Sequence, residues 1–332
     1  RVSTLGGLPG IEKSFMWEKI NAPQQDHFYS DHPHYGAIMP LGQPFLTNGQ
    51  LRFIQAWIGA GAPAAGVVAD PALLEDASRF ESPPFVVLGP PESGFQLHLG
   101  PFDVWPNIDR EVLYFEPMET RVPQFISGYE ISMRPGSHHF ILYNYPGDQS
   151  TPEPGVYRDI RDARRSSDVS EAASLFPLRY FIGTQTPSVN YSFPPGIAMR
   201  LPPGSGFDLN SHYVKTDDEE IFGEVYANLY TVDPMAVEFV ALPGHFSNFN
   251  INLPAGQVTT LTETFEFSEK KHLVQMWSHA HEKMLEFSVE RVGGEYDGQL
   301  LYWTNDWAHP PLLEFDDPLT VQQGEGFRLI TT

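Results

Sequence analysis

The sequence predicts a mainly β protein, with two β units preceded by a short α-helical segment. The chain of 332 residues contains 28 Gly and 31 Pro without a repeating period, and turns this frequent suit short strands better than long helices. From about residue 95 onward, β-branched and aromatic runs alternate with Pro, Gly, Asn or Asp. Many short antiparallel strands of this kind predict sandwiches or barrels.

One strong pattern predicts the N-terminal helix. Thr47 and Gln50 have the spacing of a capping box, in which a hydroxyl starts a helix and an amide three residues later closes its first turn. Apolar side chains then recur at helical spacing, and Gly59 ends the run. These side chains are Leu51, Ile54, Trp57 and Ile58. We therefore assign residues 1–66 to a helical segment and residues 67–94 to a linker.

Five β-rich runs indicate strands, and Asp233-Pro234 interrupts their pattern. The runs span residues 112–115, 140–143, 225–230, 264–267 and 285–289. Because proline cannot donate to a strand ladder, we place the boundary between the two β units at Asp233-Pro234. The first unit then spans residues 95–234 and the second spans residues 235–332. The chain reads as a strand up to Thr332, so we expect the second unit to be incomplete at its C-terminus.

Charge and composition restrict the partners. Lys and Arg number 20 against 42 Asp and Glu, which gives a net charge of −22. Nucleic acid and anionic membranes attract the opposite sign, so we expect neither as a partner. No apolar run approaches the roughly 20 residues that cross a bilayer, which predicts no membrane span. The acidic composition favours an extracytoplasmic location, periplasmic or secreted. The absence of Cys excludes disulfides, thiolate metal sites and covalent CxxCH haem attachment within these residues.

Adjacent histidines, His138 and His139, begin a predicted strand. On a regular strand the two rings would point to opposite faces. They can reach one metal only if the backbone is irregular, and Pro135-Gly136 just before them makes that possible. The alternative is a pair of structural histidines. His212 also enters a probable strand, and its alternative is a lone core or surface histidine.

A second pair, His279 and His281, has the i, i+2 spacing that puts both rings on one face of a strand. The same alternation places Trp277 on that face, so the rings are expected on the more apolar side, where they need a metal or a hydrogen-bonded network. A set of ligands made only of imidazole suits copper or zinc best.

The order HH, HY, HxH carries a resemblance. The intervals are 73 residues from His139 to His212 and 67 residues from His212 to His279. This arrangement resembles the copper type II, ascorbate-dependent monooxygenases, the family of peptidylglycine α-hydroxylating monooxygenase and dopamine β-monooxygenase, over residues 95–332. The segments that match are Arg134-Pro135-Gly136-Ser137-His138-His139, Ser211-His212-Tyr213, His279-Ala280-His281, Trp307-Ala308-His309-Pro310-Pro311 and Gly324-Glu325-Gly326-Phe327-Arg328-Leu329.

The resemblance implies two successive antiparallel, jelly-roll-like β-sandwiches, each with one copper. It implies a first copper on His138, His139 and His212 that accepts electrons from a small-molecule reductant such as ascorbate. It implies a second copper on His279 and His281, where dioxygen and a substrate C–H bond react. That second site normally has a Met as third ligand. Here the expected Met would fall beyond Thr332, and the alternative is an altered second site.

Residues 1–66 carry a fainter resemblance, to the C-terminal half of a class I c-type cytochrome. It rests on residues 37–42 and on the helix that follows, and it implies Met39 as a haem c axial ligand. His27, His32 and His34 are alternative axial ligands. Such a module, or a cytochrome partner, would feed electrons to the first copper. The alternative is a helix packed on the sandwich.

Three functions compete at this stage. The first is an enzyme, a copper-dependent monooxygenase that hydroxylates a C–H bond with dioxygen and an external one-electron reductant. The second is a non-catalytic metal-binding or assembly-forming protein on the same scaffold, which an incomplete second site favours. The third is a glycan-binding sandwich, suggested by 6 Trp, 14 Tyr and 24 Phe, although aromatic residues usually fill cores. Nothing in the sequence identifies the substrate.

Overall fold

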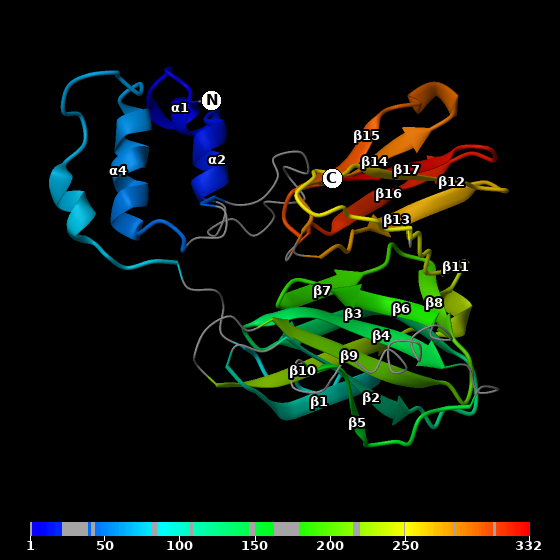
Figure 1. Ribbon diagram of the computed structural model, residues 1–332. Coiled ribbons are helices and arrows are strands. Elements are labelled where there is room, and N and C mark those ends of the chain that lie inside the picture. The colour runs from blue at the N-terminus through cyan, green and yellow to red at the C-terminus, as the bar shows by residue number, and fades with distance from the viewer. Residues whose placement is uncertain are drawn as a thin grey trace. The chain divides into compact units, whose positions relative to one another are not determined.

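The computed structural model describes eleven stretches of the chain. They are residues 2–21, 39–40, 44–80, 85–106, 109–145, 150–162, 179–214, 220–248, 250–281, 283–307 and 310–332. This part of the chain is mainly β, with a few short helices near the N-terminus (Figure 1), so the predicted class is confirmed. It divides into two units, Pro84–Ser247 on the one hand and Arg1–Pro83 with Asn248–Thr332 on the other.

The N-terminal helices are α1 (Gly7–Glu12), α2 (Phe15–Asn21) and α4 (Asn48–Gly59). The predicted capping box is confirmed, because Gln50 N–H donates to Thr47 Oγ1 at 3.0 Å and Thr47 N–H donates to Gln50 Oε1 at 2.9 Å. The helices share a small apolar core that contains Trp17, Ile20, Leu51 and Ile58. Two side chains of the predicted apolar periodicity, Leu51 and Ile58, are thus buried in this core.

The start of α4 is held by the segment that follows it. A 3-10 turn, η2 (Pro71–Glu75), packs directly against Gly49. A Cβ on Gly49 would lie 2.2 Å from Leu73 O and 2.7 Å from Asp76 O, so only glycine allows this approach. Two of the free amides at the helix start are satisfied by this segment, since Asn48 N–H donates to Ser78 O at 2.7 Å and Gly49 N–H donates to Asp76 O at 3.2 Å.

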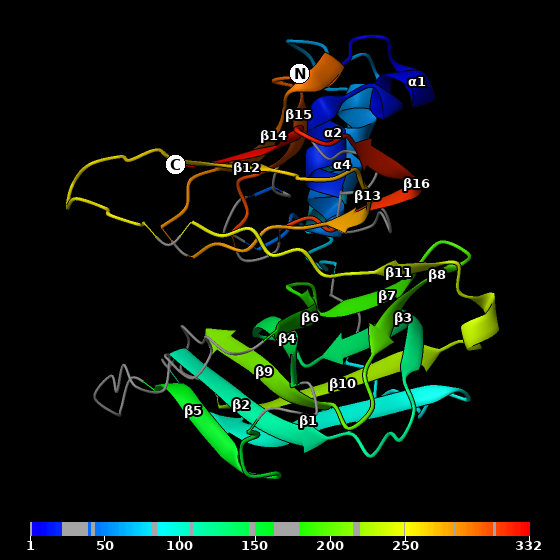
Figure 2. The same cartoon turned by 90° about the vertical axis from the view of Figure 1, so that its right-hand side faces the viewer.

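The unit Pro84–Ser247 contains two sheets. The first has the order β1-β10-β3-β8-β11, with β7 also paired to β3, and the second has the order β5-β2-β9-β4-β6 (Figures 1 and 2). The first sheet consists of β1 (Gly94–Val104), β3 (Gln124–Met133), β7 (Ser188–Ser192), β8 (Ile197–Leu201), β10 (Ile221–Thr231) and β11 (Phe239–Ala241). The second consists of β2 (Asp109–Pro117), β4 (Ser137–Tyr145), β5 (Tyr157–Asp162), β6 (Arg179–Thr184) and β9 (Gly206–Val214). Of the named strand pairs, only β8 and β11 run parallel.

One apolar core joins these two sheets, because strands of both contribute to it. Leu97, Ile131 and Val225 come from the first sheet, and Phe140 and Leu209 from the second. Strand alternation sends neighbouring side chains to the opposite face of the second sheet. On β9 that face carries Asp208, Asn210 and His212, which are also buried. The second sheet therefore has an apolar inner face and a buried polar outer face.

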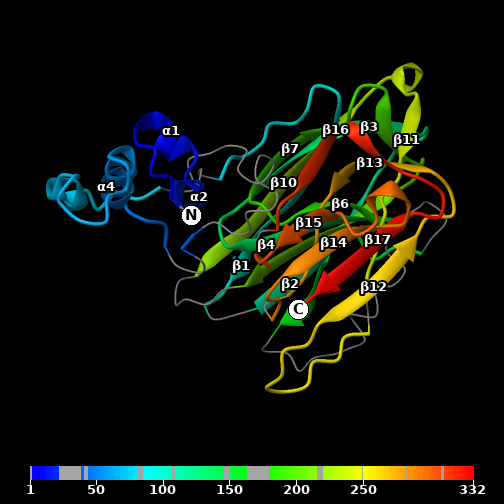
Figure 3. The same cartoon turned by 90° about the horizontal axis from the view of Figure 1, so that it is seen from above.

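The remaining strands form two small sheets around a core of their own. The larger has the order β12-β17-β14-β15 (Figure 3), and the smaller pairs β13 with β16. Their bounds are β12 (Leu261–Glu266), β13 (Lys271–Met276), β14 (Phe287–Val292), β15 (Leu300–Thr304), β16 (Leu313–Val321) and β17 (Gly326–Thr331). Tyr302, Val289 and Phe327 are central to the core. All of these sheets are small, and the predicted pair of jelly-roll-like sandwiches is confirmed only as far as the mainly β class.

The predicted strands coincide with observed ones. Residues 112–115 lie in β2, 140–143 in β4 and 225–230 in β10, while 264–267 and 285–289 overlap β12 and β14. Two short 3-10 turns, η4 (Pro234–Ala236) and η5 (Gly294–Tyr296), interrupt the strand pattern. The turn η4 occupies the predicted boundary at Asp233-Pro234, and β11 beyond it pairs with β8 of the same unit.

Gly49 provides a test of the helical segment. Replacing Gly49 with Ala raises helix propensity but drives a methyl group into two backbone carbonyls, so we expect a net destabilisation of about 1–3 kcal/mol. The measurement is amide hydrogen exchange of α4, which should accelerate. Gly59→Ala is the matched control, because its Cβ would meet only Ile11 Cδ1, at 4.0 Å, and exchange should stay the same or slow. Equal exchange rates in the two variants would contradict the packing of η2 on α4.

Candidate metal centre

Three buried histidines from β4 and β9 come together in the unit Pro84–Ser247. His138 Nδ1 lies 3.2 Å from His139 Nδ1 and 3.2 Å from His212 Nδ1. The three residues are buried, with exposed fractions of 5%, 3% and 2%. One ligand atom from each lies within 4.8 Å of those of the other two, and the three residues form a group that can hold a metal ion.

An irregularity in β4 brings the neighbouring rings together. Ser137 pairs with Tyr213 and His139 pairs with His212, so His138 is an extra residue in β4 at this point of the ladder. Such a bulge leaves one residue unpaired and changes the direction of its side chain. The turn before it contains Gly136 at a φ of +89°, a conformation that favours glycine. The irregular backbone expected at Pro135-Gly136 is therefore present, and both rings reach one focus.

The spacing of the three nitrogens suits a metal ion. Imidazole nitrogens bind zinc or copper at about 2.0–2.1 Å, and a tetrahedral angle between two such bonds separates the nitrogens by about 3.3–3.4 Å. The observed 3.2 Å is close to that value. Imidazole is a good ligand for copper and zinc alike, so this geometry supports a metal site without choosing between them.

Three polar side chains contact the outer nitrogens of the cluster. His139 Nε2 lies 2.9 Å from Asn210 Oδ1 and 3.4 Å from Glu111 Oε1. His138 Nε2 lies 3.1 Å from Gln185 Nε2. All three side chains are buried. His139 thus has an inner nitrogen that faces the ring of His138 and an outer nitrogen beside two oxygen acceptors, which is the usual arrangement around a bound metal.

Two tyrosines close to this region stay protonated. Burial raises the pKa of Tyr213, the neighbour of His212, to about 12, and Glu224 N–H donates to its hydroxyl oxygen at 3.2 Å. Burial, together with the charges of Glu111 and Asp208, also raises the pKa of Tyr143 to about 12. Neither phenol therefore offers an anionic oxygen ligand at neutral pH.

The second predicted pair lies outside regular structure. His279 and His281 follow β13, which ends at Met276, so the prediction that they share a strand face was wrong. Ser278 instead bonds to a side chain, with its Oγ 3.0 Å from the hydroxyl of Tyr302. The two histidines are exposed rather than apolar-facing, yet their rings stay together, with centroids 5.0 Å apart at an angle of 84°.

Met284 is the methionine that follows this pair in the sequence. Met284 is buried, and its N–H donates to His281 O at 2.9 Å, which closes a turn after the pair. Ala308 and His309, from one of the later motifs of the resemblance, lie outside the described residues.

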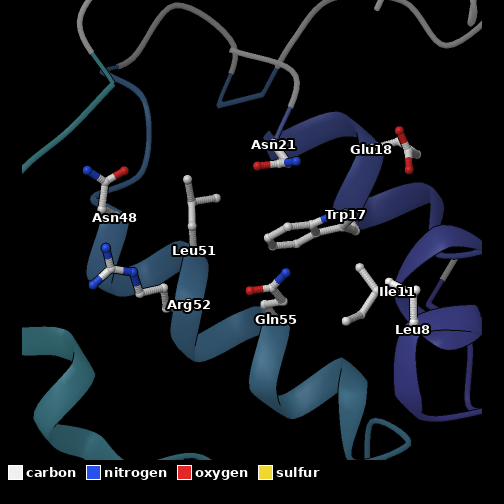
Figure 4. Close-up of a pocket in the computed structure, with 9 residues that line it drawn as sticks. All are labelled: Leu8, Ile11, Trp17, Glu18, Asn21, Asn48, Leu51, Arg52 and Gln55. Atoms are coloured by element: carbon white, nitrogen blue, oxygen red, sulfur yellow. The ribbon is translucent and has the colours of Figure 1, made fainter. Parts of the chain in front are cut away.

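The candidate haem ligand Met39 lies near the helical segment. This residue is 38% exposed, and its N–H donates to Lys19 O at 3.0 Å. A cavity of about 500 Å³ lies among α1, α2 and α4, lined in part by Trp17, Leu51 and Arg52 (Figure 4). Met39 is not among the described residues that line it. His27, His32 and His34 lie outside the described residues, so a haem site stays a prediction from the resemblance.

Comparison with known proteins adds no assignment. No family model matches the sequence, and no curated protein matches it. In the part of the chain that the structure describes, no helix is both long enough and apolar enough to cross a membrane.

The outer contacts of the histidines were missed at the sequence level. Asn210 precedes His212 by two residues, so strand alternation alone places it on the same face, and this signal could have found it. Glu111 and Gln185 come from distant parts of the chain, and no sequence motif marks either residue. Only the pairing of strands brings them to the cluster.

Loss of one ligand tests the metal centre. His139→Ala removes one of three nitrogens from a buried focus, and we expect the metal content of copper-loaded protein to fall by about one ion per chain. The measurement is metal analysis after gel filtration, with circular dichroism to verify folding. His272→Ala is the control, because His272 is exposed and lies in the sheet of β13 and β16, where its Nδ1 is 3.2 Å from Thr320 Oγ1. Unchanged metal content in His139→Ala would refute the site.

Proposed function

We propose that this protein is a copper-dependent monooxygenase that hydroxylates a C–H bond with dioxygen and an external one-electron reductant such as ascorbate. The observation that carries the proposal is the convergence of His138, His139 and His212 on one point with metal-ligand spacing. The order and spacing of the histidine motifs favour copper over zinc, through the resemblance to the type II copper monooxygenases. Each β unit would then be one of the family's sandwiches.

The two histidine groups are suited to different tasks. Copper, when bound, supplies one-electron redox chemistry. The triad is buried, and the outer nitrogens of His138 and His139 contact protein groups, so it excludes substrate and suits the storage and transfer of an electron. His279 and His281 are exposed, with rings close enough to act together, so they suit a site that small molecules reach.

We also propose an extracytoplasmic location. The net charge of −22 is the feature that supports it, because a strongly acidic chain stays soluble in such a setting. A cytochrome partner and haem c remain expectations of the N-terminal resemblance.

A second candidate is a non-catalytic metal-binding protein on the same scaffold. The specific observation in its favour is the contrast between a complete, closed triad and a pair of histidines in an irregular segment. Such a protein would hold one ion tightly and would have no second redox site.

Oxygen consumption separates the two candidates. We expect copper-loaded protein to accelerate ascorbate-dependent oxygen uptake when a hydroxylatable substrate is present, and His281→Ala to lose this activity at least tenfold while keeping the triad's metal. His139→Ala should lose it as well. An oxygen electrode with product analysis makes the measurement, and free copper at equal concentration is the blank. Tight binding of a single ion without oxygen uptake in any tested substrate class would favour the second candidate.

A further inference from the structure

We propose that Asn210 and Glu111 form a positioning pair that fixes His139 as an Nδ1 ligand and makes the triad favour the more highly charged state of its metal. This inference deepens the proposed function and rests on its metal site. The pair is assembled from adjacent strands, Glu111 on β2 and Asn210 on β9, while His139 lies on β4 beyond β9.

The orientation of the Asn210 amide follows from its neighbours. Its Nδ2 lies 3.1 Å from Glu111 Oε1 and 3.2 Å from Val112 O. A carboxylate and a carbonyl oxygen are both acceptors, and an amide NH2 has two protons to donate. Both protons are thus used, and Oδ1 must be the atom that faces His139 Nε2 at 2.9 Å.

The amide in turn decides the tautomer of His139. Because Asn210 Oδ1 can only accept, His139 Nε2 must carry the proton and donate it. Glu111 Oε1, 3.4 Å from the same nitrogen, is also an acceptor and favours the same tautomer. In the neutral ring the Nδ1 lone pair then points at the focus of the triad, where a metal needs it.

Glu111 also brings a negative charge close to the centre. It is buried beside His139, where attraction to a cation is screened less than at the surface. Three neutral imidazoles leave a divalent ion with its full charge, and one carboxylate behind a ligand offsets part of it. A divalent copper gains more from this charge than a monovalent one, so the reduction potential of the site is lowered.

Neutral substitution at the pair tests both parts of this inference. Glu111→Gln keeps the shape and removes the charge. We expect Cu(II) binding to weaken about tenfold more than Cu(I) binding, measured by competition with chelators selective for each state. A tenfold change in that ratio corresponds to a potential about 59 mV higher for one electron. Equal effects on Cu(II) and Cu(I), or none, would overturn the charge role.

Asn210→Ala should behave differently, because it removes the hydrogen bond that orients the His139 ring and keeps the charge of Glu111. We expect both copper states to bind about 10–100-fold more weakly, as for other groups that orient metal ligands. In the double variant the loss should be smaller than the product of the single losses, since the two residues act through one ring. If the loss of copper affinity in the double variant equals the product of the two single losses, Asn210 and Glu111 do not act as a pair.

A measurement without metal keeps the inference separate from the proposed function. Nitrogen-15 NMR of the metal-free protein reports which ring nitrogen carries the proton. We expect His139 to be protonated on Nε2 in the unmodified protein and to show mixed tautomers in Asn210→Ala. If the protein binds no copper, the proposed function fails, and this tautomer alone decides whether the pair positions His139.

Glu130→Gln is the matched control for charge removal. Glu130 is a partly buried carboxylate on β3, in the other sheet of the same unit, and Tyr230 donates its hydroxyl proton to it at 2.5 Å. This variant should leave the ratio of copper affinities and the His139 tautomer unchanged. A shift equal to that of Glu111→Gln would reduce the effect to net charge and overturn the pair.

Discussion

One extra residue in β4 determines the geometry of the candidate metal centre. A regular strand would send the rings of His138 and His139 to opposite faces of the sheet, one into the apolar core and one away from it. The bulge between Ser137 and His139 breaks that alternation and turns both rings to the same point, opposite His212 on the neighbouring strand. Gly136, at positive φ, lets the chain enter the bulge. The cluster is therefore a product of backbone geometry as much as of residue type.

Several buried polar side chains lie on the outer face of the second sheet. Burying a polar group without a partner costs on the order of 1–3 kcal/mol, so each of these side chains needs a hydrogen bond. Asn210 meets this need by bridging Glu111, Val112 and His139. Asp208, fully buried further along β9, is paired with Arg158 and accepts the hydroxyl proton of Tyr145 at 3.1 Å. Linked contacts of this kind make the face rigid, which suits a site that must hold three nitrogens in place.

The contrast between the histidine groups concerns access rather than residue type. The triad is enclosed and buried, while His279 and His281 are exposed in an irregular segment anchored through Ser278 and Tyr302. A closed site protects its metal from exogenous ligands, and an open one admits them. This difference gives the proposed division between electron storage and substrate chemistry its physical basis. For the same reason, we expect the pair by itself to bind a metal more weakly than the triad.

Local patterns in the sequence were enough for the mainly β class, the capped helix at Asn48–Gly59 and the positions of several strands, because capping, turn composition and alternation act between residues close in the chain. They also indicated the irregular backbone before His138, which Pro135-Gly136 makes possible. The strand assigned to His279 and His281 was wrong, since bonds from Ser278 to the distant Tyr302 replace the ladder there. Glu111 and Gln185 could not be found from the sequence either. Their place beside the histidines depends on which strands pair and in what register, and only the tertiary structure decides that.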